Sequence, residues 1–537
     1  MLFDFIEISG IKLFQPDTQS RESIREWAEN KLRLESVAGE YFGATANGIL
    51  KNTFNIYHNR LLEDIKSINT KNCLVFILYL YEESGKLSDR FKEGKLTLEE
   101  ENYWIENGAL FRQTCDFLCD LIIQSSDAGA SDNVLLETRA LWRERFSKVW
   151  TLAKMSVELA SQANLAHMLF PDSTVVRIYP KESVYFIQVG DLKNENDDCL
   201  RDFPNRSKRN ILLRKKYLGD YSIEHDFHNY ANSEHLNLGF QDSFGFTYAD
   251  YSFVLTSIHQ SVKPITDPSK IPAMKLSDFE LQLSEYGLSK EAISNFVNLI
   301  ILGANNFEDS KREIWNFRQE NRVSKRPLLK YNYDGETWLL WSNKKLSEYF
   351  TLLDLEVSYN TFSKDRRSKS LNLALSRINN ENGKKFEKLA AKLLSQVSIT
   401  GKSYSRNIKS NNHRLTIPQA VGEIDFLGID KKTGKLVLYE FKMNNTGFEA
   451  RGFRKDISDY TGKNGYLNSF SNKVQWVREN LNEVSKMIAQ NESWNDQIIG
   501  LEFAFLTHFN SIASCFINDV RCLTIYELLD EKESQIT

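Results

Sequence analysis

Two short strands that carry acidic residues limit most strongly what this chain can fold into. The segment QAVGEIDFLGIDKKTGKLVLYEFKMNN alternates apolar and polar residues from Val421 to Asp430 and again from Lys435 to Lys442. The KKTG sequence between these runs supplies a turn, because Gly434 can take a positive φ. The pattern therefore predicts an antiparallel hairpin in a partly buried sheet.

The register of this hairpin decides which side chains meet. If Asp430 pairs with Lys435 across the turn, counting outward places Asp425 opposite Glu440, and a slip of one residue would remove that pairing. Directly opposed residues on one sheet face have Cβ atoms about 4.5–5.5 Å apart, and like charges there are destabilising. Two facing carboxylates need a cation or a shared proton. The hairpin thus predicts a cation site.

A lysine completes a set of groups suited to phosphate chemistry. Lys442 lies two residues after Glu440, so the strand period points both side chains to one face, and the same register puts Glu423 opposite Lys442. Hard carboxylate oxygens favour Mg²⁺, with Mn²⁺ as a substitute. A lysine beside two acids can orient water and stabilise charge that develops on phosphate. These residues predict metal-dependent phosphodiester hydrolysis.

The residues before the hairpin add an acid and several cations. KKFEKLAAKLLSQV has the periodicity of an amphipathic helix, and Glu387 lies beside its apolar stripe. A polar, basic stretch then leads to the first strand. Its cations are candidate phosphate contacts: Lys402, Arg406, Lys409, His413 and Arg414.

The order of a helix-borne Glu, then GEID, then a strand ending in EFK resembles the PD-(D/E)XK, or restriction-endonuclease-like, nuclease superfamily. Within it, GEIDFLGI…LVLYEFK is most similar to nuclease-related domains and type IV restriction-like nucleases. The resemblance covers roughly residues 381–530. It implies that Asp425 and Glu440 bind metal, that Lys442 is the catalytic lysine and that Glu387 is the acid on the preceding helix.

The resemblance also implies the rest of this domain. We expect an α/β domain with a central mixed sheet flanked by helices, including a long helix over 466–490, a strand at LEFAFLTHF and a strand followed by a helix at RCLTIYELLDE. In the family a later helix often adds a Gln or Lys near the site. Lys473 and Gln475 are the candidates for that role. They are also included among the candidate nucleic-acid contacts.

The remainder of the chain predicts a multidomain α+β protein. The length of 537 residues exceeds one compact core. Helical periodicity favours a mainly helical N-terminal domain, with breaks near Gly85, Gly94 and residues 128–133. Strand-like runs at STVVRIYP and SVYFIQVGDL, an N-cap at Ser289 and the turn dipeptide Asp334-Gly335 indicate an α+β middle region. The expected division is 1–169 helical domain, 170–362 sensor or partner-binding region, 363–380 basic junction and 381–537 nuclease domain.

Other features carry weaker signals. The net charge of −4 gives no overall attraction to nucleic acid, so binding needs a local basic surface. The basic run RSKRNILLRKK (206–216) is such a candidate, and a solvated surface helix explains it equally well. His225, His228 and His235 lack a fourth zinc ligand at a standard spacing, so solvated histidines are favoured over a metal site.

Cysteine usage and hydropathy bear on the compartment. The six cysteines show no paired zinc spacing, and Cys115 and Cys119 fit two buried thiols on one helix face. The N-terminal sequence lacks the pattern of a signal peptide, and the longest apolar stretch is too short for a membrane span. We therefore expect a cytoplasmic protein without a membrane partner.

The sequence as a whole predicts a Mg²⁺-dependent nuclease acting on DNA and regulated by its N-terminal region. By resemblance it would serve bacterial anti-phage or restriction-type defence, as a homo-oligomer or with a partner protein bound through the N-terminal region. Two alternatives stay open. One is a catalytically inactive nucleic-acid-binding or scaffold protein with a nuclease fold, and the other is a nuclease directed at RNA.

Overall fold

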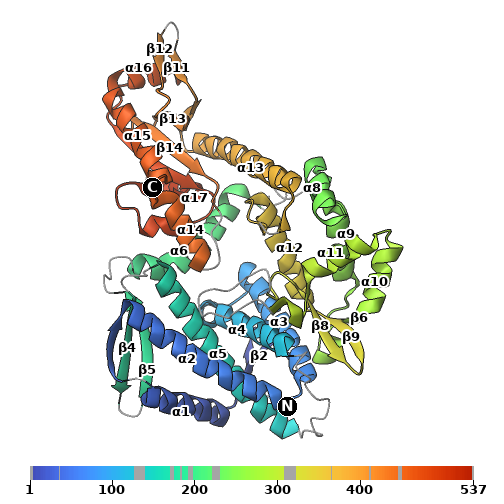
Figure 1. The fold of residues 1–537 in the computed structure, drawn as a ribbon. Helices are drawn as coiled ribbons and strands as arrows, with labels where there is room; N and C mark the ends of the chain where they lie inside the picture. The colour runs from blue at the N-terminus through green and yellow to red at the C-terminus, as the bar shows by residue number, and fades with distance from the viewer. Residues whose placement is uncertain are drawn as a thin grey trace. The chain divides into compact units, whose positions relative to one another are not determined.

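The chain folds into two compact units (Figure 1). The computed structural model describes residues 4–35, 37–125, 139–169, 174–181, 184–191, 197–219, 230–307, 322–363, 366–410, 413–444 and 450–534. Unit 1 comprises 1–192, 230–354 and 362–372, and unit 2 comprises 193–229, 355–361 and 373–537. Helices and sheets occur in both, so the mixed α+β class expected from the sequence is confirmed.

The units do not follow the expected boundaries. Residues 197–219 lie in the middle of the sequence but pack with the C-terminal residues, and the expected region 170–362 forms no unit of its own. The expected junction at 363–380 is largely the start of a long helix, α13 (Lys369–Gln396). Local polarity marked this segment as a linker, although Leu371, Ala374 and Leu375 are buried.

Unit 1 begins with a hairpin, β1 (Asp4–Ile8) and β2 (Ile11–Gln15), and continues as a helical layer. The helices of that layer are α1 (Thr18–Glu35), α2 (Gly43–Lys66), α3 (Thr70–Lys92), α4 (Leu98–Ser125) and α5 (Arg139–Leu169). The strands β3 (Gly39–Phe42), β4 (Thr174–Lys181) and β5 (Val184–Asp191) form a three-stranded sheet. Helix α3 runs through Gly85, so the helix break expected there is wrong, whereas the break at Gly94 is confirmed. Residues 128–133 lie outside the described residues.

The second part of unit 1 is a four-stranded sheet with helices. Its strands are β6 (Ala273–Lys275), β7 (Ile301–Leu302), β8 (Leu328–Tyr333) and β9 (Glu336–Leu340), in the order β6-β9-β8-β7. Its helices are α8 (Glu234–Phe244), α9 (Tyr248–Ser261), α10 (Leu276–Glu285), α11 (Lys290–Ile300) and α12 (Asn343–Ser358). Two predictions are confirmed here. Ser289 caps α11 by accepting the N–H of Ala292, and the β8–β9 turn uses positive φ at Asp334 and Gly335.

Unit 2 is built on a five-stranded mixed sheet in the order β10-β13-β14-β15-β16. The strands are β10 (Ile399–Tyr404), β13 (Ile424–Asp430), β14 (Lys435–Lys442), β15 (Leu501–Thr507) and β16 (Arg521–Thr524). The first three pair antiparallel, and β15 and β16 then add parallel to β14. The strand expected at LEFAFLTHF and the strand and helix expected at RCLTIYELLDE are confirmed, the helix as α17 (Ile525–Ser534).

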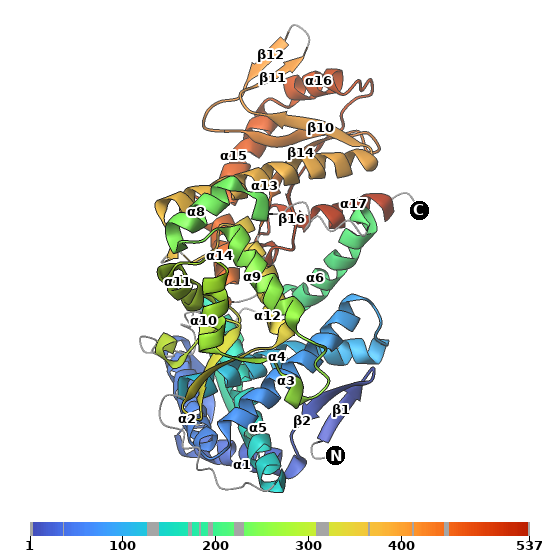
Figure 2. The same ribbon diagram turned by 90° about the vertical axis from the view of Figure 1, so that its right-hand side faces the viewer.

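Helices cover both faces of this sheet, as Figure 2 shows. One face packs against α13 and α17, through a core that includes Phe386, Phe426 and Tyr439. The other packs against α14 (Ala450–Thr461), α15 (Tyr466–Glu479) and α16 (Leu481–Asn491), through a core that includes Leu427, Leu438 and Phe470. The single helix expected over 466–490 is interrupted, because Asn480 leaves helical geometry between α15 and α16.

A further helix, α6 (Asp197–Leu218), joins unit 2 from the middle of the chain. Its basic run pairs with acids of α17: Arg206 with Glu527, Arg209 with Asp530, and Lys216 with Asp530 and Glu533. These pairs favour the surface-helix interpretation of residues 206–216. A disulfide joins Cys199 of α6 to Cys515, 316 residues away, a separation over which no spacing pattern could indicate a pair.

The remaining cysteine and hydropathy predictions have simple outcomes. Cys115 and Cys119 are free and buried on α4, as expected. In the described part of the chain, every helix is too short or too polar to cross a membrane.

Candidate functional site

The β13–β14 hairpin has the register that the sequence predicted. Asp430 pairs with Lys435, and the ladder continues outward to Phe426 paired with Tyr439. Asp425 lies one residue beyond this ladder, and its Oδ2 accepts the backbone N–H of Phe441 at 3.0 Å. The Asp425 carboxylate is therefore held at the end of the hairpin away from its turn, beside Glu440.

The predicted acids and lysine come together at this point. The Lys442 Nζ donates to Glu440 Oε1 at 2.8 Å and lies 3.8 Å from Asp425 Oδ2. Strand alternation explains the arrangement, because Glu440 and Lys442 share one face while Phe441 packs into the opposite core. The three residues thus form one cluster at the open end of the sheet.

Lys473 of α15 is a second lysine in this cluster. Its Nζ donates to Glu440 Oε2 at 2.6 Å, and both side chains are 6% exposed. Its position beside Glu440 is the place near the site that the resemblance gave to a Gln or Lys of a later helix. Because its side chain is buried against the sheet, it has little exposed surface for the nucleic-acid contact also considered for it. Gln475 points away from the sheet, is exposed and donates to Glu479.

Electrostatics shows the cost of placing these carboxylates together. Burial, followed by the charge of Glu440, raises the pKa of Asp425 to about 6, although Lys442 and Lys473 oppose the shift. Burial disfavours the charged form of Lys442, but Glu440 and Asp425 outweigh it and raise the lysine pKa. The ionised form of the Asp425 carboxylate is therefore disfavoured in the folded protein, and the neighbouring Lys442 stays protonated.

Glu387 lies near the cluster without bonding to it. It extends from α13, which covers the opposite face of the sheet. Burial and the charge of Glu423 raise its pKa, and Lys442 and Glu440 are close enough to contribute. The structure thus brings Glu387 into the electrostatic neighbourhood of the site, and Glu423 stands exposed beside it.

The donor set fits a small divalent cation. Asp425, Glu440 and Glu387 supply three carboxylates against two lysines, which leaves net negative charge, and oxygen donors are the ligands that Mg²⁺ prefers. In the residues that the structure describes, no three His, Cys, Asp or Glu side chains converge as a metal site. The fit therefore rests on the pair Asp425 and Glu440, with Glu387 nearby.

One neighbour of the site had no signal in the sequence. Tyr466, at the start of α15, lies with its ring centroid 4.8 Å from Lys442 Nζ. The ring covers one side of the ammonium group and limits its contact with water. An isolated aromatic residue before a helix gives no indication of such a contact, which depends on how α15 crosses the sheet.

The basic candidates lie on β10, where Lys402 is, and on the segment that connects β10 to β13. Strands β11 (Asn407–Ser410) and β12 (His413–Thr416) form a separate two-stranded hairpin there. The candidate cations of this segment are all exposed: Lys402, Arg406, Lys409, His413 and Arg414. Of the histidines considered as zinc ligands, His235 is exposed, and His225 and His228 lie outside the described residues.

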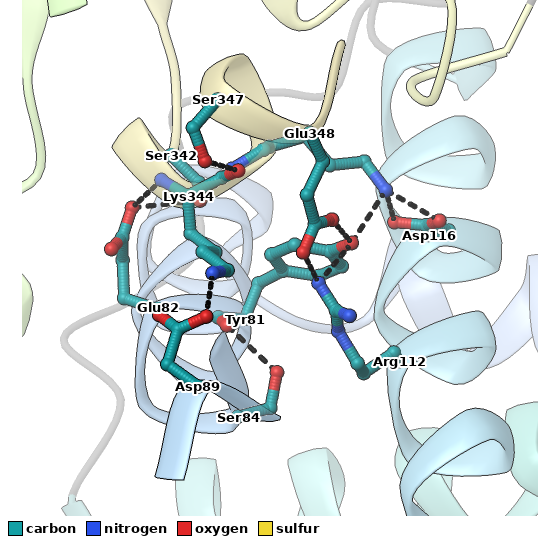
Figure 3. Close-up of polar contacts among 11 residues, drawn as sticks. Tyr81, Glu82, Ser84, Asp89, Arg112, Asp116, Ser342, Lys344, Ser347 and Glu348 are labelled. Carbon is teal, nitrogen blue, oxygen red and sulfur yellow. Dashed lines mark hydrogen bonds and ion pairs between the residues drawn. The ribbon is translucent and has the colours of Figure 1, made fainter. Parts of the chain in front are cut away.

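A second cluster of charges, in unit 1, joins α12 to α3 and α4 (Figure 3). Tyr81 donates to Glu348, which also pairs with Arg112, and Lys345 bonds to Asp116 at 2.6 Å and Tyr81 at 3.0 Å. The Tyr81 hydroxyl, the two carboxylates and the two basic side chains bond to one another within the network. This favours an anchor for α12 over a ligand site.

Comparisons of the chain with protein-family models, with curated proteins and with solved structures gave no match.

Proposed function

We propose that this protein is a metal-dependent nuclease that hydrolyses phosphodiester bonds of DNA through Asp425, Glu440 and Lys442. The observation that carries the proposal is the meeting of these three groups at the open end of the β13–β14 hairpin, within 3.8 Å of the Lys442 Nζ. The antiparallel strands followed by parallel ones, with helices on both faces, support a restriction-endonuclease-like fold for unit 2.

The residues have separable roles in this proposal. Asp425 and Glu440 would hold Mg²⁺ or Mn²⁺, with Glu387 as a further acid, and the bound ion would supply charge neutralisation and an activated water. Lys442 holds a proton and a positive charge where charge develops on phosphate. The Phe441 N–H and Lys473 fix the two carboxylates in place. A regulatory role for unit 1, oligomer formation and a place in anti-phage or restriction-type defence belong to the same proposal.

The substrate is tested with the purified full chain. Supercoiled plasmid, linear duplex DNA and single-stranded RNA are incubated with Mg²⁺, Mn²⁺ or EDTA. Metal-dependent cutting of DNA with little cutting of RNA is expected. Cutting of RNA alone would show that the protein is a nuclease directed at RNA instead of DNA. Cutting in EDTA would exclude the proposed role of a metal ion.

One observation favours the non-catalytic alternative. Both oxygens of Glu440 already accept hydrogen bonds from lysines, as in a site that needs no metal. Calorimetric titration of Mn²⁺ into wild type and Asp425→Ala separates the two functions. If the site is catalytic, wild type should bind Mn²⁺ and Asp425→Ala should not. Asp496→Ala is the control, because Asp496 is an exposed acid of the same unit, and this variant should bind Mn²⁺ as wild type does. A scaffold protein would show no binding that depends on Asp425.

The raised pKa of Asp425 predicts a stability change of definite sign. In EDTA, Asp425→Asn should stabilise the protein at pH 8, by on the order of 2 kcal/mol, because the native state disfavours the ionised carboxylate. The folded pKa of about 6 lies above the unfolded value, so the gain should shrink as pH falls from about 6 and vanish below about 4. Thermal melts of both proteins across this pH range measure it. A variant that is less stable than wild type at pH 8 would contradict the prediction.

A further inference from the structure

The β11–β12 hairpin is held in place through one of its faces. Ile408 is fully buried on that face, and Ser410 donates to the Gln490 side chain of α16 at 2.9 Å. Asn491 donates from its side chain to the Lys409 carbonyl at 3.0 Å. The hairpin is therefore oriented by α16, and its other face is turned outward.

The outward face carries two cations directly opposite each other. Lys409 and Arg414 are cross-strand partners, and both are exposed. Opposed like charges destabilise a hairpin unless an anion lies between or beside them. The Arg414 Nε donates to the Asn407 side chain at 2.8 Å, so one donor of the guanidinium is used within the hairpin.

In the described part of the chain, no acidic side chain forms an ion pair with either cation, Lys409 or Arg414. The sequence explains why, since it contains no Asp or Glu between Glu387 and Glu423. In a chain whose net charge is −4, this makes the hairpin a local basic surface.

We propose that the outward face of β11–β12 binds the phosphate backbone of duplex DNA and delivers it to the candidate active site; this rests on the proposed function. The hairpin leaves and re-enters the sheet where Tyr404 pairs with Ile424, the residue before Asp425. Its base is closed by the Ile417 N–H, which donates to the Arg406 carbonyl at 2.8 Å. A DNA phosphate backbone bound to the hairpin therefore lies near the end of the sheet that carries Asp425.

The shape and composition of the hairpin favour duplex DNA over other nucleic acids. A two-stranded β-ribbon fits the major groove of B-form DNA, whereas the major groove of double-stranded RNA is too deep and narrow. Proteins that hold single strands use aromatic side chains on which bases stack. The sequence from Arg406 to Thr416 contains no Phe, Tyr or Trp. His413 is the one aromatic ring in this stretch of the sequence, so the hairpin offers charge and shape for a duplex and little surface on which bases could stack.

The test measures binding in EDTA, so that cleavage plays no part. Fluorescence anisotropy of the full chain is followed with labelled duplex DNA, duplex RNA of matched sequence and single-stranded DNA. The variant Lys409→Glu with Arg414→Glu is compared with Lys392→Glu with Lys432→Glu, a control variant that makes the same charge change at two exposed lysines of unit 2 outside β11–β12. Circular dichroism of each variant checks that the fold is retained.

The expected result is tightest binding to duplex DNA, weakened at least about 10-fold by the β11–β12 variant and less than about 3-fold by the control variant. The slope of log K against log salt should fall by roughly 2, as for two lost phosphate contacts. Equal effects of the two variants, preference for RNA or single strands, or no duplex binding by wild type would each overturn the inference. Hairpin-dependent binding by a chain that cuts nothing with Mg²⁺ would overturn the proposed nuclease instead.

Discussion

Lys442→Met is expected to lower the rate of DNA cleavage by about 10²–10³-fold, because it removes the ammonium group that the proposal places beside the reacting phosphate. Methionine retains most of the side-chain volume and can pack under Tyr466, so unit 2 should remain folded. The measurement is the single-turnover rate of plasmid nicking at saturating Mg²⁺. Lys432→Met, at the exposed turn of the same hairpin, is the matched control and should cut at the wild-type rate.

The Mn²⁺ affinity of the same variant distinguishes chemistry from metal binding. Lys442 bonds to Glu440 but would not itself be a metal ligand, so its loss should leave Mn²⁺ bound at least as tightly as in wild type. A variant that cuts at the wild-type rate would remove Lys442 from the mechanism. A variant that no longer binds Mn²⁺ would assign the lysine to organising the site.

Lys532→Met is expected to destabilise unit 2 by about 3 kcal/mol or more, because it leaves a buried carboxylate without its positively charged partner. Lys532 donates to Asp430 Oδ2 at 2.9 Å and to Glu502 Oε2 at 3.0 Å, and the Asp430 side chain is fully buried. Burial raises the pKa of Asp430, but Lys532 together with hydrogen bonds from Lys432 and Thr433 outweighs it, and the net shift is downward. Amide hydrogen exchange in β13 and β14 should accelerate by about 100-fold.

An exposed pair supplies the control for this prediction. Lys455 and Asp459 are four residues apart on α14, with the lysine side chain 71% exposed, so Lys455→Met should change stability by less than about 0.5 kcal/mol. Adding Asp430→Asn to Lys532→Met should recover part of the loss, because the amide carries no charge. If Lys532→Met and Lys455→Met had equal effects, the buried pair would not stabilise the sheet.

The sequence predicted the hairpin and its acids because their signals are local. The KKTG turn fixed the register, and strand alternation then placed Asp425, Glu440 and Lys442 together. The strand that became β15 and the strand and helix that became β16 and α17 have equally local patterns.

The errors arose where packing between distant segments decides the outcome. Nothing near residues 193–229 indicates that α6 joins the C-terminal unit, since its partners on α17 lie more than 300 residues away. The Cys199–Cys515 disulfide has the same cause. Lys473 was expected near the site, but its bond to Glu440 could not be predicted, because that bond depends on the path of α15 across the sheet.

The central claim is that the Asp425 cluster cuts DNA with a bound metal ion. The most direct measurement is conversion of supercoiled plasmid by the purified full chain with Mg²⁺ and with EDTA, beside Asp425→Ala and Asp496→Ala. Cutting by wild type and Asp496→Ala in Mg²⁺, abolished by EDTA and in Asp425→Ala, is the predicted result. Cutting by Asp425→Ala at the wild-type rate would contradict the claim and place the active site elsewhere.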